Sequence, residues 1–260
     1  MTDSPTLPSP VKGEDKWKRP SSVKNGTFYG VGVGPGDPEL MTLKAVRVLE
    51  GSAVIAVPKS ALAAPDAASH ALSIASKGAD LKGKEILELL LPMTKDAARL
   101  KEARQIAASA IAGRLEKGLD VSFITLGDPM LYSTFSYLVP FVKKLLPDAT
   151  VSVIPGVTSF SAAAASAIIP LAESGEKVAI IPAAYDIEDL RERIAANDTV
   201  VLMKVNKAMD ALIGLLCLMG LEKNAVFVSR ASWPDEEVVT DIKSLKGANP
   251  DYFSTVIIKK

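Results

Sequence analysis

The stretch that decides the fold is residues 30–37, GVGVGPGD, a glycine-rich turn at the end of an apolar run. Two further turns end apolar runs later in the chain, at residues 127–132, GDPMLY, and residues 155–159, PGVTS. In an open α/β sheet, the loops at the carboxyl ends of the strands line the crevice where ligands bind. Because glycine lets the backbone approach a ligand closely, the three loops together predict one small molecule held mainly by main-chain atoms.

Around these turns, short apolar or β-branched runs alternate with stretches of helical periodicity. The first half predicts strands at 27–33, 53–57, 84–90 and 121–126, and helices at 41–50, 67–77, 96–117 and 133–146. Strands that alternate with helices of this length indicate parallel pairing, with helices covering both faces of the sheet.

The second half restarts at Thr150 after Pro147 and Asp148, and its pattern changes toward the end. It predicts strands at 150–154, 177–182, 199–203, 225–230, 236–242 and 252–258, and helices at 157–168, 187–196 and 206–220. No helix fits between the last three strands, so short turns must join them and the second sheet must be mixed, with antiparallel strands. We therefore predict two α/β domains, 27–148 and 149–260, with a cleft between them.

Composition limits the classes of function that remain open. The chain has 260 residues and a formal net charge of zero, so no global field draws it to nucleic acid or to an anionic membrane. Its one cysteine, Cys217, is expected in the core and excludes an internal disulfide. Its one histidine, His70, is expected to be incidental, and no metal site is predicted.

Residues 1–26 are polar and charged, and they hold four prolines. They offer too few apolar side chains to offset the entropy of ordering, so a flexible tail is expected. They also lack the apolar core of a signal peptide. The longest apolar run, 151–172, is broken by proline and glycine and predicts strand, turn and helix rather than a membrane span. A cytoplasmic protein is the resulting expectation.

The first loop invites a dinucleotide interpretation, which its spacing does not support. A G-x-G-x-x-G match starting at Gly30 meets Pro35, and one starting at Gly32 meets Asp37. Pro35 and Pro38 also remove two amide donors that a phosphate cradle would need. A dinucleotide oxidoreductase, or a non-enzymatic nucleotide-binding module, is therefore disfavoured, and a cationic or neutral ligand suits this loop better.

Each loop by itself is equally explained as a structural turn, because glycine, proline and aspartate are ordinary turn residues. Their order along the chain is more specific. Residues 33–37 (VGPGD), 40–45 (LMTLKA), 127–129 (GDP), 155–159 (PGVTS) and 201–204 (VLMK) together resemble the tetrapyrrole methyltransferase family. The resemblance covers nearly all of 27–260. It implies an S-adenosylmethionine-dependent C-methyltransferase of two α/β domains, with the cofactor in the cleft between them, and a homodimer.

Motif by motif, the resemblance also implies the cofactor contacts. These lie in the three loops and at later strand ends: Pro35, Gly127, Asp128, Leu131, Tyr132, Thr158, Ser159, Ala183, Ala184, Met203, Arg230, Ala231 and Thr255. For Met203 a core position is an open alternative, since methionines in strands usually fill cores.

Finer features concern the acceptor. Residues 26–32 (GTFYGVG), 91–93 (LPM), 127–135 (GDPMLYSTF) and 252–255 (YFST) are similar to the enzymes that methylate C20 of precorrin-2, or of its cobalt-containing counterpart, in cobalamin biosynthesis. Uroporphyrinogen-III methyltransferases of the family carry a Tyr-Asp-Arg-type segment where this chain has residues 57–59, VPK, which argues against uroporphyrinogen. The alternative keeps the fold and changes the acceptor to another corrin position, another tetrapyrrole, a protein or rRNA, although the zero net charge argues against rRNA.

The residue inventory suits this chemistry. A meso carbon of a reduced tetrapyrrole is nucleophilic, so such an enzyme has mainly to align donor and acceptor and to exclude water. By motif, Asp128 and Tyr132 are the nearest candidates to accept the meso proton. The substrate's carboxylates need cations, and Lys59, Lys204 and Arg230 stand at strand ends expected to face the cleft, where a solvated surface role is equally compatible. The identity of the proton acceptor and the presence of cobalt in the substrate stay open at this point.

Overall fold

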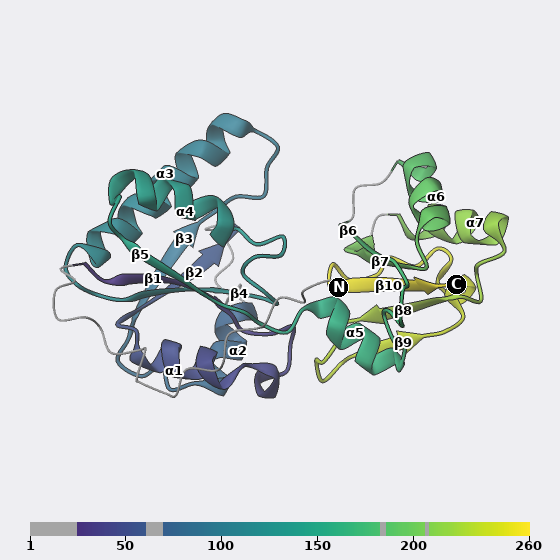
Figure 1. Ribbon diagram of the computed structural model, residues 1–260, viewed down its shortest axis with the longest axis horizontal. Coiled ribbons are helices and arrows are strands. Elements are labelled where there is room, and N and C mark those ends of the chain that lie inside the picture. Colours follow the sequence, from purple (N-terminus) through teal and green to yellow (C-terminus); the bar gives the residue numbers. More distant parts are fainter. Residues whose placement is uncertain (1–24, 61–69, 183–185, 206–207) are drawn as a thin grey trace, which may run out of the picture.

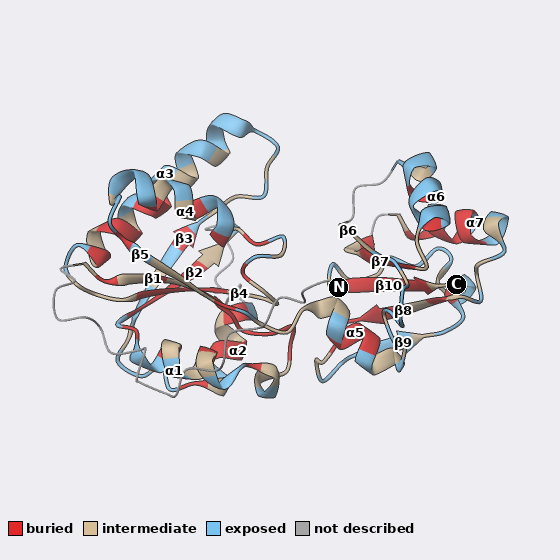
Figure 2. Ribbon diagram, in the orientation of Figure 1, coloured by how far each residue is buried: buried red, intermediate tan, exposed pale blue. Residues whose placement is uncertain are grey.

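The computed structural model describes residues 25–60, 70–182, 186–205 and 208–260. Its described part forms two five-stranded sheets, each covered by helices on both faces (Figures 1 and 2). The predicted α/β class is confirmed. Except for residues 25 and 26, the predicted tail lies outside the described residues.

The first sheet is parallel throughout, with strand order β3-β2-β4-β1-β5. Its strands are β1 (Thr27–Gly32), β2 (Val54–Lys59), β3 (Glu85–Leu90), β4 (Val121–Thr125) and β5 (Thr150–Ile154). Helices α1 (Leu43–Gly51) and α2 (His70–Gly78) cover one face, and α3 (Ala97–Leu115) and α4 (Phe135–Leu145) cover the other (Figure 1). The four predicted helices and the parallel pairing of this half are confirmed.

Aromatic side chains pack between helix α4 and the first sheet, on the sheet face that α3 and α4 cover. The Phe135 ring lies 5.0 Å from that of Phe28 and 6.1 Å from that of Phe123, centroid to centroid, and all three are buried. A Cβ at Gly30 would lie 2.6 Å from the Phe135 ring, so a side chain there would displace the ring. Gly30 is thus required by helix packing rather than by a ligand.

The expectation that strand 150–154 opens the second half is wrong. β5 pairs in parallel with β1, from Thr27 opposite Thr150 to Val31 opposite Ile154. Its side chains explain the placement, because Ile154 is fully buried with the α1 and α2 side of the core while Val151 and Val153 pack against the other side. The predicted boundary at residue 148 is therefore misplaced, and the chain crosses to the second sheet only after Ile154.

The second sheet has strand order β6-β7-β10-β8-β9. Its strands are β6 (Val178–Pro182), β7 (Thr199–Met203), β8 (Ala225–Ser229), β9 (Glu237–Val239) and β10 (Ser254–Lys259). β6 and β7 are parallel, and the pairs made by β10 and β9 are antiparallel, which confirms the predicted mixed sheet. Helices α6 (Ile187–Ala196) and α7 (Met209–Met219) lie on one face and α5 (Ser159–Ala167) on the other.

Helix α7 corrects the prediction for Cys217. The helix buries Leu212, Ile213, Leu215 and Leu216 against the sheet, and Cys217 falls on its exposed side. The local sequence is apolar all round, so it did not indicate which side faces the core. Among the described residues, no helix combines the length and the apolar character needed to cross a bilayer.

Candidate active site

The three predicted loops meet backbone to backbone, because β4, β1 and β5 are neighbours in the first sheet. The Gly127 N–H donates a hydrogen bond of 2.8 Å to the Gly34 carbonyl oxygen. A Cβ at Gly32 would lie 2.4 Å from the Gly127 oxygen, and one at Gly156 would lie 2.2 Å from that same atom. The approach of the loops therefore requires glycine at both positions, and Gly127 itself has a φ of 65° that favours glycine.

The Asp128 carboxylate ties the second loop to the third. Its Oδ1 accepts a hydrogen bond of 2.8 Å from the Met130 N–H, and its Oδ2 accepts one of 3.0 Å from the Gly156 N–H. Both oxygens are therefore bound to main-chain donors, and the carboxylate sets the distance between the two loops.

Tyr132 links the second loop to the second sheet. Its backbone is left-handed, with a φ of 49°, and its hydroxyl donates a hydrogen bond of 3.2 Å to the Ile180 carbonyl oxygen on β6. A left-handed tyrosine is strained, so the loop holds this side chain in place across the boundary between the sheets.

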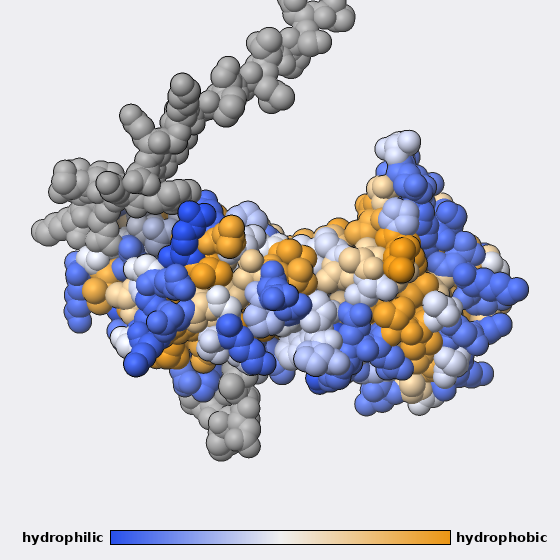
Figure 3. All heavy atoms as spheres, turned by 90° about the horizontal axis from the view of Figure 1, so that it is seen from below, coloured by the Kyte–Doolittle hydropathy of each residue, from blue (hydrophilic) through white to orange (hydrophobic). Residues whose placement is uncertain are grey.

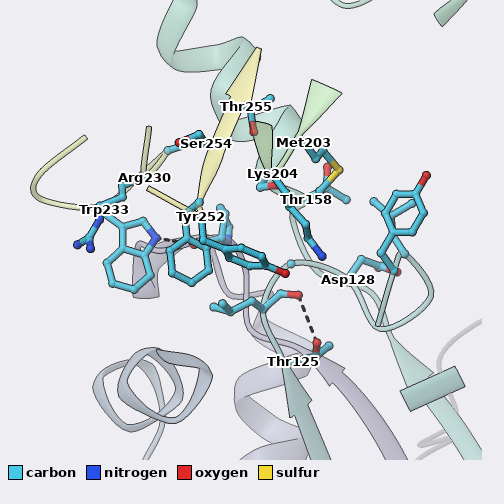
Figure 4. Close-up of a pocket in the computed structure, with 18 residues that line it drawn as sticks. Thr125, Asp128, Thr158, Met203, Lys204, Arg230, Trp233, Tyr252, Ser254 and Thr255 are labelled. Atoms are coloured by element: carbon cyan, nitrogen blue, oxygen red, sulfur yellow. Dashed lines mark hydrogen bonds between the residues drawn. The ribbon is translucent and has the colours of Figure 1, made fainter. Parts of the chain in front are cut away.

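These loops line one side of a cleft whose other side comes from the second sheet (Figure 4). Its empty space, including the part open to solvent, is about 890 Å³. Predicted site residues that line it are Pro35, Gly127, Asp128, Leu131, Tyr132, Thr158, Ser159, Met203, Lys204, Arg230, Ala231 and Thr255. Ala183 and Ala184 lie outside the described residues.

Six lining residues were missed by the sequence reasoning: Thr125, Leu126, Trp233, Tyr252, Phe253 and Ser254. Tyr252 and Phe253 stand in the segment 252–255 that carries the resemblance, so their position before β10 was a usable signal. Trp233 comes two residues after Ala231, in the turn between β8 and β9, and only the fold brings it to the cleft.

Both polar ends of the cleft favour anionic groups. Helix α5 begins there, and the Thr158 hydroxyl caps it by accepting from the Ser161 N–H at 3.4 Å. A helix N-terminus attracts anionic groups. Across the cleft, the Lys204 ammonium lies 5.1 Å from the Tyr252 ring centroid (Figure 4). Among the described residues, no carboxylate forms an ion pair with Lys204.

Arg230 is already neutralised. Its Nε donates to Asp251 at 2.7 Å and its Nη1 to Asp235 at 2.8 Å. The hydrogen bond to Asp251 raises the pKa of Arg230. Burial alone would raise the pKa of Asp251, but the Phe253 N–H and the Arg230 guanidinium outweigh it and hold that pKa below its usual value. Arg230 therefore lines the cleft as a structural residue, and its charge is already paired with two carboxylates.

Two other residues differ from expectation. Lys59 ends β2 and pairs with Glu88 on β3 at 2.5 Å, and it is not among the residues that line the cleft. His70, expected to be incidental, begins α2 and packs its ring against those of Trp233 and Phe253, with centroid distances of 5.0 and 5.1 Å. Neither placement is encoded by local sequence, since each depends on a neighbouring strand or turn.

Comparisons with known proteins agree with this architecture. The model of a family described as Tetrapyrrole (Corrin/Porphyrin) Methylases matches residues 27–246. A cobalt-precorrin-2 C(20)-methyltransferase of Salmonella typhimurium is 32% identical over 91% of this chain and 97% of its own length. A probable cobalt-precorrin-2 C(20)-methyltransferase of Methanocaldococcus jannaschii is 39% identical over 89% of this chain and 95% of its own length.

Solved structures share the fold. A uroporphyrin-III C-methyl transferase from Thermus thermophilus, complexed with S-adenyl homocysteine, aligns with a TM-score of 0.63 and 25% identity over 90% of this chain and 98% of its own. A cobalt precorrin-4 methyltransferase aligns with a TM-score of 0.66 over 90% of this chain and 94% of its own, at 23% identity.

Proposed function

This chain belongs to the tetrapyrrole (corrin/porphyrin) methylase family, and on that premise we propose that it transfers a methyl group from S-adenosylmethionine to C20 of precorrin-2 or of its cobalt complex. The relatives that are similar over nine-tenths of the chain, and that are named for this position, carry the proposal. The same similarity places the enzyme in cobalamin biosynthesis.

The polar and apolar groups that line the cleft match the parts of S-adenosylmethionine. The three loops offer main-chain groups, and Leu131, Met203 and Ala231 offer apolar surface for a purine. The N-terminus of α5 suits the carboxylate of the cofactor's amino-acid part, next to Thr158 and Ser159. When bound, the sulfonium supplies an activated methyl group.

The hydrogen bonds of Asp128 and Tyr132 favour a positioning role for both residues over direct proton transfer. Both carboxylate oxygens of Asp128 accept hydrogen bonds from main-chain N–H groups, and the Tyr132 hydroxyl donates to a β6 carbonyl oxygen. We assign them to holding the second loop where methyl donor and meso carbon meet, since alignment of the reactants is the main requirement of the reaction.

We assign a substrate carboxylate to Lys204 and withdraw that role from Lys59. Lys204 stands in the cleft over the Tyr252 ring, whereas Lys59 is paired with Glu88 outside it. A Lys204 contact with one propionate or acetate group would orient the macrocycle, because charge-assisted hydrogen bonds are the strong ones.

A homodimer in the cytoplasm completes the proposal. Its support is the family resemblance, together with exposed apolar side chains such as Leu218 on α7, which is 89% exposed. Figure 3 shows hydrophobic surface in several groups among hydrophilic side chains on the face viewed from below. Light scattering at micromolar concentration gives the mass directly, and the mass of a monomer would reject the dimer.

The decisive assay supplies the protein with S-adenosylmethionine carrying a ¹³C-labelled methyl group. Precorrin-2 and its cobalt complex are offered in separate reactions, and NMR locates the added methyl. Label at C20 is expected with at least one of the two acceptors. Label at another ring position would establish the alternative methyltransferase, and absence of transfer to either acceptor would reject the proposed substrate.

A further inference from the structure

Trp233 joins the two halves of the molecule at the rim of the cleft. It stands in the turn between β8 and β9, yet its indole Nε1 donates a hydrogen bond of 2.7 Å to the Pro35 carbonyl oxygen in the first loop (Figure 4). Its neighbour Ser232 accepts a hydrogen bond of 3.1 Å from the Asp37 N–H. The Trp233 ring also packs against the α1 and α2 side of the first core.

The first loop is shaped to receive this ring. A Cβ at Gly36 would lie 2.1 Å from Cδ1 and 2.4 Å from Nε1 of Trp233. The backbone of Gly36 is not left-handed, so its conformation alone would accept alanine. The indole is therefore the reason that a side chain does not fit at this position.

Several hydrogen bonds hold the turn that presents Trp233. Arg230 and Ser232 have φ values of 49° and 68°, which only a well-supported loop maintains in residues other than glycine. The Glu236 carboxylate accepts from the Ser232 N–H at 2.5 Å and from the Ser166 hydroxyl at 2.7 Å. The Arg230 N–H donates to the Phe253 carbonyl oxygen at 3.0 Å, which ties the turn to the start of β10.

Three neighbours hold the ring itself. Phe253 stacks on it at a centroid distance of 5.9 Å and an interplanar angle of 21°, and His70 meets it edge-on at 5.0 Å. The Arg230 guanidinium carbon lies 5.8 Å from the ring centroid. With these contacts the indole has a fixed position, from which its one N–H fixes the Pro35 carbonyl.

We propose that Trp233 is a positioning residue that clamps the first loop to the second sheet and so sets the width of the cofactor site. The proposal rests on the proposed function, because Pro35 is one of the residues assigned to S-adenosylmethionine. Trp233 acts through Pro35 and Gly36: it sets where the first loop stands relative to Met203 and Ala231 across the cleft. His70 and Phe253 contribute indirectly, by holding the Trp233 ring in place.

The test measures the dissociation constant of S-adenosylhomocysteine by calorimetry for variants of the full chain. Trp233→Phe keeps an aromatic ring, although a smaller one, and removes the donor, and it should weaken binding about threefold to tenfold, the range of one lost hydrogen bond. Gly36→Ala should weaken binding at least as much, because the indole must leave its place. In the double variant Gly36→Ala/Trp233→Ala the clash is gone, so its affinity should equal that of Trp233→Ala alone.

A second readout follows the ring directly. The chain has two tryptophans, Trp17 and Trp233. In a Trp17→Phe background, S-adenosylhomocysteine should shift the emission of Trp233.

Gly113→Ala is the matched control for Gly36→Ala in the binding measurement. Gly113 lies in α3 with nothing within 4 Å of the added Cβ, so this variant should leave the dissociation constant unchanged.

Two results overturn the clamp and leave the proposed function standing. If the wild type binds S-adenosylhomocysteine and both Trp233→Phe and Gly36→Ala bind it equally well, the clamp is rejected and the proposed function stands. If the losses of Gly36→Ala and Trp233→Ala simply add, Trp233 does not constrain Gly36 and the clamp is likewise rejected. A wild type that binds neither S-adenosylmethionine nor S-adenosylhomocysteine rejects the proposed function and the clamp with it.

Discussion

The Oδ2 atom of Asp128 accepts a hydrogen bond of 3.0 Å from the backbone N–H of Gly156. This contact joins two loops that lie 28 residues apart in sequence, and the other carboxylate oxygen holds the Met130 N–H within its own loop. One side chain thus fixes the second loop and its distance from the third. The cofactor site that we propose depends on that distance.

Asp128→Asn should weaken cofactor binding even though it preserves shape. An amide offers one oxygen, so one of the two N–H donors would face an NH₂ group. Losing a hydrogen bond to a charged acceptor costs about 1.5–3 kcal/mol, or roughly tenfold to a hundredfold in the dissociation constant of S-adenosylhomocysteine. Calorimetry measures this loss.

Asp96→Asn is the matched control. Asp96 also accepts two main-chain N–H groups, from Ala98 and Arg99, but it does so with one oxygen, as the N-cap of α3 away from the cleft. Asparagine caps helices as well as aspartate does, so neither stability nor affinity should change much. An Asp128→Asn protein with wild-type affinity would show that the charge of this side chain is not needed.

Gly156→Ala should destabilise the loop junction. The new Cβ would lie 2.2 Å from the Gly127 carbonyl oxygen, which is backbone and has no side-chain freedom with which to move away. We expect a lower melting temperature and loss of measurable cofactor binding. Gly113→Ala provides the comparison, because alanine in an open helical position should stabilise the protein by up to about 1 kcal/mol. A Gly156→Ala protein as stable as the wild type would contradict the close packing of the loops.

Lys204→Ala should raise the KM for the tetrapyrrole and leave the dissociation constant of S-adenosylhomocysteine nearly unchanged. A partly solvated charge-assisted contact is worth about 1 kcal/mol, or roughly fivefold in KM. Lys59→Ala, which breaks a pair with Glu88 outside the cleft, should leave both constants unchanged. Equal effects of the two substitutions would remove Lys204 from the substrate site.

The Arg230–Asp251 pair should give the cleft a sensitivity to acid. The pKa of Asp251 is lower in the folded protein than in the unfolded chain, so its contribution to stability is fully present above the unfolded value of about 3.9 and is lost as the pH falls through the folded value. Melting temperatures of the wild type and of Asp251→Asn should therefore differ from pH 5 to 7, begin to converge as the pH falls below about 3.9, and meet only below the folded pKa of Asp251. A difference that persists unchanged at pH 3 would contradict this linkage.

Much of the fold was predictable because its signals are local. Glycine and proline turns after apolar runs placed the three loops, and helical spacing placed the helices. The same signals did not place strand 150–154 in the correct sheet. The sheet that a strand joins depends on its pairing partner, here β1, and not on the sequence of the strand itself. The side of α7 on which Cys217 lies could not be predicted either, because leucines surround it in sequence.

In the candidate site, too, some residues could be predicted from sequence and others depend on contacts that only the fold creates. Twelve predicted residues line the cleft. The resemblance to the methyltransferase family supplied eleven of them, and the position of Lys204 at a strand end supplied the twelfth. Trp233 and His70 could not be predicted, as they meet only when a turn of the second sheet reaches the first. Lys59 was expected to face the cleft but does not line it, because its side chain pairs with Glu88, which lies opposite Val57 in the register of β2 and β3.

The most direct test of the central claim is a calorimetric titration of the wild-type chain with S-adenosylmethionine, S-adenosylhomocysteine and NADH. We propose that the three loops bind a sulfonium cofactor, and the glycine spacing of the first loop does not fit a dinucleotide. We predict saturable binding of the first two ligands with one site per chain, and no heat of binding with NADH. Binding of NADH together with the absence of binding by both S-adenosyl ligands would contradict the account.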